Sequence, residues 1–295
     1  MPTDVLPAGA PGAPGDTRDL EAGLDALQTA KPPRPARNLG RSILAPLLGL
    51  GVFLGAWQIL YWLELKPAYV IPSPADVALA FTQLWQRGDV QDAILTSLER
   101  GILGFLASVA IATPLGILVA RVRWIRAAFG SIITGLQVLP SVAWVPAAII
   151  WFGLSDATVY FVVLMGAIPS IINGLVAGVD HIPPLYRNVG RVLGASTWQQ
   201  IRWVMLPAAL PGYLAGLKQG WAFSWRSLMA AEIIAVGGTI GFGLGSLLQQ
   251  GRELAAMSTI FVAILLILAI GMLVELAVFG PLERRLLRSR GLGAR

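Results

Sequence analysis

Long apolar blocks constrain this chain more than any other feature of its sequence. Several of them reach or exceed the ~18 largely apolar residues that mark a bilayer-spanning helix. Only 13% of the residues are charged, against about 25% in soluble domains. The pattern predicts an all-α integral membrane protein with six transmembrane helices, at about residues 42–63, 102–119, 127–152, 157–179, 208–236 and 256–279.

The distribution of Lys and Arg predicts how these helices are oriented. If the N-terminus is cytoplasmic, 16 of the 22 Lys and Arg residues lie in the N-terminal segment, two inner loops and the C-terminal segment, and four lie outside. Cytoplasmic loops of membrane proteins carry such an excess. We therefore expect both termini in the cytoplasm, and we attribute the high isoelectric point to topology rather than to nucleic-acid binding.

The residue inventory excludes several kinds of catalytic site. The chain has no cysteine, which rules out disulfides, thiolate metal sites and a cysteine nucleophile. Its one histidine, His181, leaves no His-based triad and no His-based zinc site. No phosphate-binding loop with the Gly-x-x-x-x-Gly-Lys-[Ser/Thr] spacing is present either. We predict no catalytic residues, no metal site and no cofactor in this chain.

Composition divides the chain into four regions. Residues 1–40 are rich in Pro, Gly, Ala and Asp, which predicts a disordered cytoplasmic tail. Residues 41–67 contain the first transmembrane helix, and residues 68–281 contain the other five. Residues 282–295 form a basic cytoplasmic tail.

A polar segment, 180–207, separates the fourth and fifth apolar blocks on the cytoplasmic side. A short helix is expected from Leu185 to Leu193, ended by Gly194, because glycine readily takes the left-handed conformation found after helices. Ser196 or Thr197 would cap a second helix. We expect Pro207 to end that helix and to start the chain back into the membrane.

This segment resembles the cytoplasmic EAA motif of permeases from bacterial ATP-binding cassette importers. That motif has a glycine, then nine residues, an aliphatic residue, any residue and Leu-Pro, which Gly194, Val204, Leu206 and Pro207 match. Asn188-Val189-Gly190 stands where the motif has Glu-Ala-Ala, so the carboxylate is missing. Other stretches also match the family: Ile71-Pro72-Ser73-Pro74, Ser97-Leu98-Glu99-Arg100, Leu139-Pro140, Trp151-Phe152-Gly153-Leu154, Ala231-Glu232 and Pro281-Leu282-Glu283-Arg284-Arg285.

The resemblance covers about residues 68–290 and is best to the nitrate/sulfonate/taurine subfamily. It implies a type I importer fold in the bacterial inner membrane, as a homodimer with two ATPases, which hold ATP and Mg²⁺, and an external solute-binding protein. It also implies a coupling helix within 184–206 that docks on the ATPase. The residues assigned to this coupling are Tyr186, Asn188, Val189, Gly190, Gly194, Ala195, Ser196, Val204, Leu206 and Pro207.

Charge inside the fifth apolar block suggests a substrate pathway. Arg226 lies well within it, and an intramembrane charge normally faces a cavity or a partner. A guanidinium matches sulfonate, nitrate or carboxylate groups. The candidate pathway residues are Trp144, Ser224, Trp225, Arg226, Ser227 and Glu232. Pairing of Arg226 with a carboxylate or a carbonyl remains an alternative.

Two other classes of protein, and other solutes, remain alternatives. A gradient-driven secondary transporter would need paired repeats and several membrane carboxylates, but only Glu232 and Glu275 qualify. An intramembrane enzyme would need a recognisable catalytic motif. Within importers, bicarbonate, a pyrimidine or a thiamine precursor could replace a sulfonate, taurine or nitrate as the solute.

Overall fold

The computed structural model describes residues 39–67 and 69–289. The predicted tail over 1–40 therefore lies almost wholly outside the described residues, as do the last residues of 282–295. Residues 53–293 form one compact unit, and the first part of helix α2 (Leu39–Trp62) belongs to another. All regular structure in the described residues is helical.

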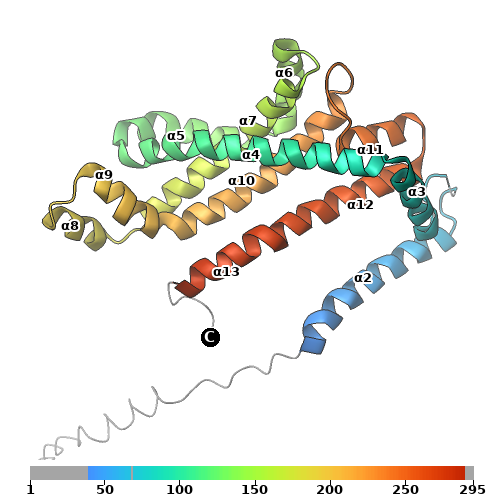
Figure 1. Cartoon of the computed structure of the whole chain (residues 1–295), viewed down its shortest axis with the longest axis horizontal. Helices are drawn as coiled ribbons and strands as arrows, with labels where there is room; N and C mark the ends of the chain where they lie inside the picture. Colours follow the sequence, from blue (N-terminus) through green and yellow to red (C-terminus); the bar gives the residue numbers. More distant parts are fainter. Residues whose placement is uncertain (1–38, 68, 290–295) are drawn as a thin grey trace, which may run out of the picture. The chain divides into compact units, whose positions relative to one another are not determined.

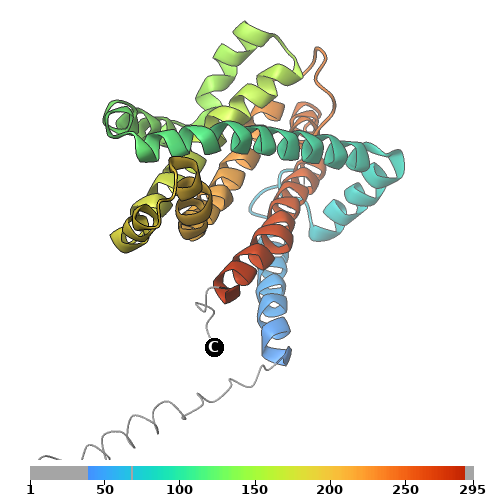
Figure 2. The ribbon, with the colours of Figure 1, turned by 60° about the vertical axis from the view of Figure 1, so that its left-hand side comes forward.

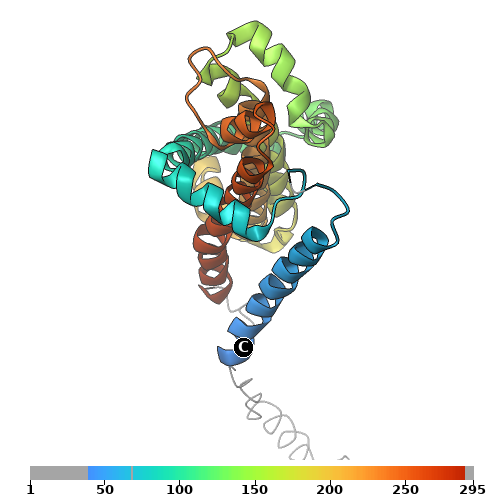
Figure 3. The same cartoon turned by 90° about the vertical axis from the view of Figure 1, so that its right-hand side faces the viewer.

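Helix α3 (Pro74–Arg87) begins in the Pro72-Ser73-Pro74 stretch that resembles the family. Ser73 caps it: the Ser73 hydroxyl accepts a hydrogen bond from the Asp76 amide, and the Asp76 carboxylate accepts one from the Ser73 amide. Val77 and Leu84 are buried, whereas Trp85 is exposed. Figure 3 shows α3 crossing α12 (Met257–Val274), where the buried face of α3 packs.

Helix α4 (Asp89–Arg121) begins thirteen residues before the predicted apolar block. Its first turns carry Ser97 and Arg100, both buried, which explains why hydropathy alone places the helix start too late. A second long helix, α7 (Asp156–Asp180), agrees with its predicted bounds to within a residue.

The predicted third span is not one straight helix. The chain forms α5 (Arg123–Val138), a short 3₁₀ turn η1 (Ser141–Trp144) and α6 (Val145–Phe152), and the two halves bend by 97°. Leu139 adopts an extended conformation just before Pro140, as expected for a residue that precedes proline. Proline therefore breaks this span rather than kinking it.

Close packing of α7 on α10 (Leu206–Ile234) forms the centre of the unit, and Figure 1 shows the two helices side by side. Gly174 and Gly178 of α7 face Gly212 and Gly216 of α10. A Cβ on any of the four would lie within 3 Å of backbone on the other helix. Glycines spaced four apart on each helix thus allow the two backbones to approach closely.

Two short helices, α8 (Pro184–Val192) and α9 (Thr197–Gln199), connect α7 to α10. Figure 2 shows them projecting past the ends of the two long helices. After α10, the chain forms α11 (Leu244–Glu253), with Leu244 and Leu247 fully buried. Glycines and polar residues keep the mean hydropathy of this helix low, so it does not stand out as an apolar block in the sequence.

Within the described residues, three helices are long and apolar enough to cross a membrane: Asp89–Arg121, Asp156–Asp180 and Met257–Ser289. The bent pair α5 and α6 would make a fourth. Helix α10 is as long as these but carries Lys218, Arg226 and Glu232, and Leu47–Trp62 within α2 is apolar but shorter. The observed helices follow the same order as the six predicted blocks. Only some of them meet the length and hydropathy criterion for crossing a membrane.

Candidate functional site

The segment 184–206 builds a helical hairpin whose turn is fixed by Gly194. Helix α8 has Pro184 in its first turn and ends near Leu193. Gly194 has φ +72°, a left-handed conformation that favours glycine. Its amide donates to the Arg191 carbonyl, and the Ala195 amide donates to the Gly190 carbonyl, each at 3.0 Å. These bonds satisfy the end of α8, as the sequence predicts.

Ser196, rather than Thr197, caps the second helix. The Gln199 amide donates to the Ser196 hydroxyl at 3.3 Å, and the Ser196 amide donates to the Gln199 side chain at 2.7 Å. This reciprocal pair fixes the direction in which the chain leaves the turn.

Pro207 does not end this helix, so that prediction is wrong. A π-helical turn, η2 (Gln200–Met205), joins α9 directly to α10. The Leu206 amide donates to the Ile201 carbonyl, five residues earlier. Pro207 has no N–H to donate to the Trp203 carbonyl, and the wider turn accommodates that missing bond. The second arm of the hairpin and α10 therefore form one continuous helical path from Thr197 to Ile234.

Gly190 sets how closely α8 lies on this path. It is buried, and a Cβ there would be 3.6 Å from Cγ of Gln200 and 3.6 Å from Cγ2 of Val204. Two of the predicted coupling residues, Gly190 and Val204, therefore hold the two arms of the hairpin together. A larger side chain at residue 190 would push the arms apart.

The other side of α8 is an exposed apolar surface, which we call the α8 surface. Val192 is 87% exposed, and the remaining members are Leu185, Tyr186, Val189 and Leu193. Contiguous exposed apolar side chains of this kind mark interaction sites. Asn188 is exposed beside them.

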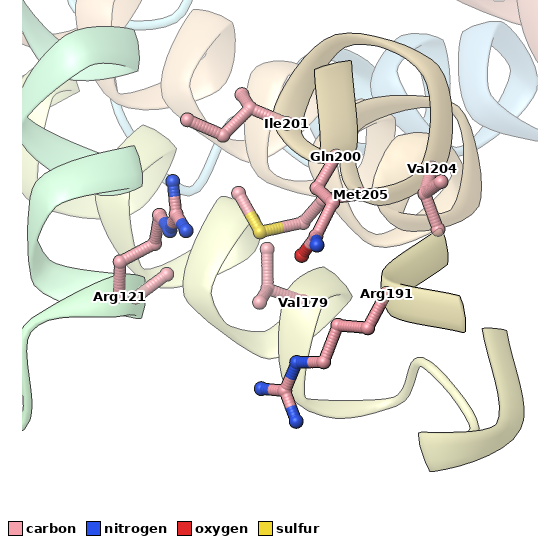
Figure 4. A pocket seen from close by; sticks show the side chains of 8 residues that line it. Arg121, Val179, Arg191, Gln200, Ile201, Val204 and Met205 are labelled. Carbon is pink, nitrogen blue, oxygen red and sulfur yellow. The ribbon is translucent and has the colours of Figure 1, made fainter. Parts of the chain in front are cut away.

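The polar groups around the α8 surface are cationic or neutral. Helix α8 contains no Asp or Glu. A cavity of about 180 Å³ lies between the ends of α4 and α7 and the hairpin, lined by Arg121, Arg191 and Gln200 together with Ala120, Val179, Ile201, Val204 and Met205. Figure 4 shows the Arg121 and Arg191 side chains on opposite sides of Val179 and Met205.

Glu232 is fully buried in a polar cluster that joins four parts of the unit. Nη1 of Arg100 on α4 donates to its carboxylate at 3.2 Å, the Ser97 hydroxyl lies 2.7 Å from Oε2, and the Gly245 amide donates to it at 3.0 Å. The second guanidinium nitrogen of Arg100 reaches Asp156 at the start of α7 at 2.5 Å.

This cluster also orders the loop between α10 and α11. Nη1 of Arg100 donates to the Gly241 carbonyl at 3.1 Å, and the Leu244 amide donates to the Ser97 hydroxyl at 2.9 Å. Ser97, Arg100 and Glu232 all lie in stretches that resemble the family, but nothing in the sequence predicts that they meet. Their separation along the chain, more than 130 residues, leaves no local signal of contact.

The six predicted pathway residues do not share one face. Ser224, Ser227 and Glu232 are buried inside the unit, and the Ser227 hydroxyl donates to Ser141 at 2.7 Å. Trp225 is buried, and its indole N–H donates to the Ile267 carbonyl. Trp144 packs edge-to-face on Phe161.

Arg226 alone of these six is exposed, with its guanidinium 5.9 Å from the centre of the Phe223 ring. Among the described residues no carboxylate pairs with it, and Glu232 pairs with Arg100 instead. Two turns earlier, Lys218 forms an ion pair with Glu275 at 2.6 Å.

Comparison with known proteins decides the family. Residues 112–288 match the family described as "Binding-protein-dependent transport system inner membrane component". The chain belongs to this family. It is thus a multi-pass integral membrane permease subunit of an ABC transporter, in a family without catalytic activity of its own, and its system includes a binding protein and an ATPase.

Relatives in this family are named after different solutes. The chain is 35% identical over 248 residues to the riboflavin transport system permease of Chloroflexus aurantiacus, covering 82% of this chain and 90% of that protein. It is 29% identical to the taurine transport system permease of Escherichia coli, covering 84% and 90%. The fold is similar to a chain of the inward-facing MetNI methionine ABC transporter, with a TM-score of 0.57 at 19% identity over 67% of this chain and 95% of that chain.

Proposed function

We propose that this permease moves a small anionic solute of the sulfonate, taurine or nitrate class into the cytoplasm, driven by a partner ATPase that docks on the α8 surface. The observation that carries the proposal is the hairpin itself. It exposes apolar side chains on one arm and continues without a break into α10 on the other. A partner that moves α8 would therefore move a long helix of the permease with it.

The contacts inside the hairpin support transmission of this motion. Gly190 packs on Gln200 and Val204, so α8 and the π turn have little freedom to slide past one another. ATP would bring two ATPases together, and each would pull on one α8. The permease would then switch between two arrangements, with the loaded binding protein biasing the same equilibrium.

An anionic solute is supported by charge rather than by similarity. The exposed guanidinium of Arg226, which has no carboxylate partner in the described part of the chain, would attract an anion. The taurine relative is consistent with this, whereas the riboflavin relative shows that comparable sequences serve other solutes. Bicarbonate, a pyrimidine and a thiamine precursor are the runner-up solutes.

The proposal includes a topology and an assembly. Six spans, formed by α2, α4, α5 with α6, α7, α10 and α12, place both termini and the hairpin in the cytoplasm and the Glu232 cluster on the outer side. Two copies of the chain would form the type I pathway in a bacterial inner membrane. The excess of Lys and Arg in the segments assigned to the cytoplasm supports this orientation.

The test is ATPase activity of the purified complex in nanodiscs. The complex would be given its binding protein together with taurine, alkanesulfonates, nitrate, bicarbonate or riboflavin. Stimulation by one anion-loaded binding protein is the expected result. Stimulation only by riboflavin or another uncharged solute would contradict the anion assignment, and failure of any ATPase to copurify would contradict the docking assignment.

A further inference from the structure

Helix α10 has an open face beside the glycines that pack on α7. Gln219 and Arg226 are both exposed and lie seven residues apart. Seven residues are nearly two full turns, so the two side chains lie on the same side of the helix, about 10.5 Å apart along its axis. Ala222 lies between them and leaves space at this face.

Two cavities open along this face. One, of about 680 Å³, lies between α7 and α10 and is lined by Asn173, His181 and Gln219, with small residues around them. The other, of about 650 Å³, lies between α10 and α12 and is lined by Ala222 and Arg226, with an apolar wall that includes Trp225 and Leu268. Glu275 also lines this second cavity, but its carboxylate is paired with Lys218. Gln219 and Arg226 thus connect two hollows on one side of α10.

A further polar pair borders the first cavity. The side-chain amide of Asn173 on α7 donates to the side-chain oxygen of Gln137 on α5 at 2.5 Å. Among the described residues these two amides make no other hydrogen bond, so both N–H groups of the Gln137 side chain and the side-chain oxygen of Asn173 are left without a partner there. The first cavity therefore has free donors and acceptors beside it.

The contrast with α4 shows that this face is not suited to lipid. The exposed residues of α4 in its central turns are apolar, for example Leu103, Leu106 and Ile111. A polar or charged side chain in the bilayer core is costly unless it faces water, a cavity or a partner. The amides and the guanidinium on this face of α10 must therefore contact water or a polar ligand rather than lipid.

We infer that Asn173, Gln219 and Arg226 line the solute pathway, with Arg226 supplying the attraction for an anion and the amides supplying hydrogen bonds along the way inward. This inference rests on the proposed importer function. It shifts the pathway from the buried Ser224, Ser227 and Glu232 to the open face of α10. Selectivity for a sulfonate or carboxylate would come from the spacing of one charge and two amides.

Because the chain has no cysteine, single cysteines can be introduced without removing native ones. Gln219→Cys and Asn173→Cys would be made in the full complex, with Leu106→Cys as a control that is exposed but apolar. Each complex in nanodiscs would be treated with a thiol reagent bearing a sulfonate and with one of similar size bearing a trimethylammonium group. Copurification of the ATPase would check that each variant is assembled.

Both Gln219→Cys and Asn173→Cys should react with the water-soluble reagents, and Leu106→Cys should not. At Gln219→Cys the sulfonate reagent should react about tenfold faster, relative to the cationic one, than it does when Arg226→Gln is added, as expected for a unit charge about 10 Å away in a partly screened site. If Gln219→Cys is as unreactive as Leu106→Cys, or if Arg226→Gln leaves the reagent preference unchanged, the inference is wrong. The labelling needs neither ATP nor a binding protein, so its outcome is separate from the test of the proposed function.

Discussion

Arg100 on α4 donates a hydrogen bond to the Glu232 carboxylate on α10, and neither side chain is accessible to solvent beyond a few per cent. The same guanidinium reaches Asp156 at the start of α7. One buried cation therefore ties together the helices that pack at the centre of the unit. Removing one partner of such a pair leaves the other charge buried and uncompensated.

Arg100→Met should destabilise the protein by about 3–5 kcal/mol, because the Glu232 charge would remain buried without its partner. The measurement is thermal unfolding of the purified complex in detergent, together with the yield of folded protein. The double variant Arg100→Met, Glu232→Met should recover part of the loss. A double variant less stable than Arg100→Met would contradict this account of the cluster.

Gly190→Leu should uncouple ATP hydrolysis from transport. Its side chain would occupy the space now filled by Gln200 and Val204, so the arms of the hairpin would separate while the α8 surface remains apolar. We expect the ATPase to copurify but uptake per ATP hydrolysed to fall at least several-fold. The exposed Thr197→Ala is the control, and a normal transport-to-hydrolysis ratio in Gly190→Leu would show that this contact carries no coupling.

Val192→Asp should weaken docking of the ATPase. Val192 is 87% exposed in the α8 surface, and burial of a carboxylate in an apolar interface carries a desolvation cost. The amount of ATPase that copurifies should drop sharply. Leu79→Asp, at a comparably exposed apolar residue of α3, serves as the control, and equal recovery of the ATPase with both variants would rule out docking at Val192.

Acidification should loosen the start of α3. Hydrogen bonds from the Ser73 side chain and backbone lower the pKa of Asp76 below its ordinary value of 3.8. A carboxyl with a lowered pKa stabilises the folded state above its ordinary pKa, and this contribution is lost as the pH falls through the lowered value.

Amide hydrogen exchange in the first turn of α3 would measure this effect. The native chain should be better protected than Asp76→Asn at pH 6, and the difference should shrink as the pH is lowered through and below the lowered pKa of Asp76. A difference in exchange that stays the same over this whole pH range would show that the Asp76 charge does not stabilise this cap.

Local sequence signals account for the elements that were predicted correctly. The left-handed Gly194 and the capping Ser196 each act within a few residues, so their types and spacing suffice. The glycines of α7 could also be recognised by spacing, because small residues four apart lie on one side of a helix.

What the sequence could not supply depends on contacts between distant segments. Nothing in the sequence near Arg100 or Glu232 indicates that the two residues pair. The start of α4 is polar because it is buried around that pair. Pro207 reads as a helix terminator, yet a π turn absorbs its missing donor. The sequence does not mark Gln137, Asn173 and Gln219 as pathway residues, because a neutral amide in an apolar helix costs less than a charge such as Arg226 and does not by itself imply a cavity.

The most direct test of ATP-driven import is solute accumulation in proteoliposomes that contain the permease and its ATPase. With binding protein and labelled solute on the outer face of the permease, addition of ATP and Mg²⁺ on the cytoplasmic face should drive accumulation on that face, and Gly190→Leu should reduce it. Accumulation that follows an imposed proton or sodium gradient without ATP would contradict the account and assign the chain to gradient-driven transport.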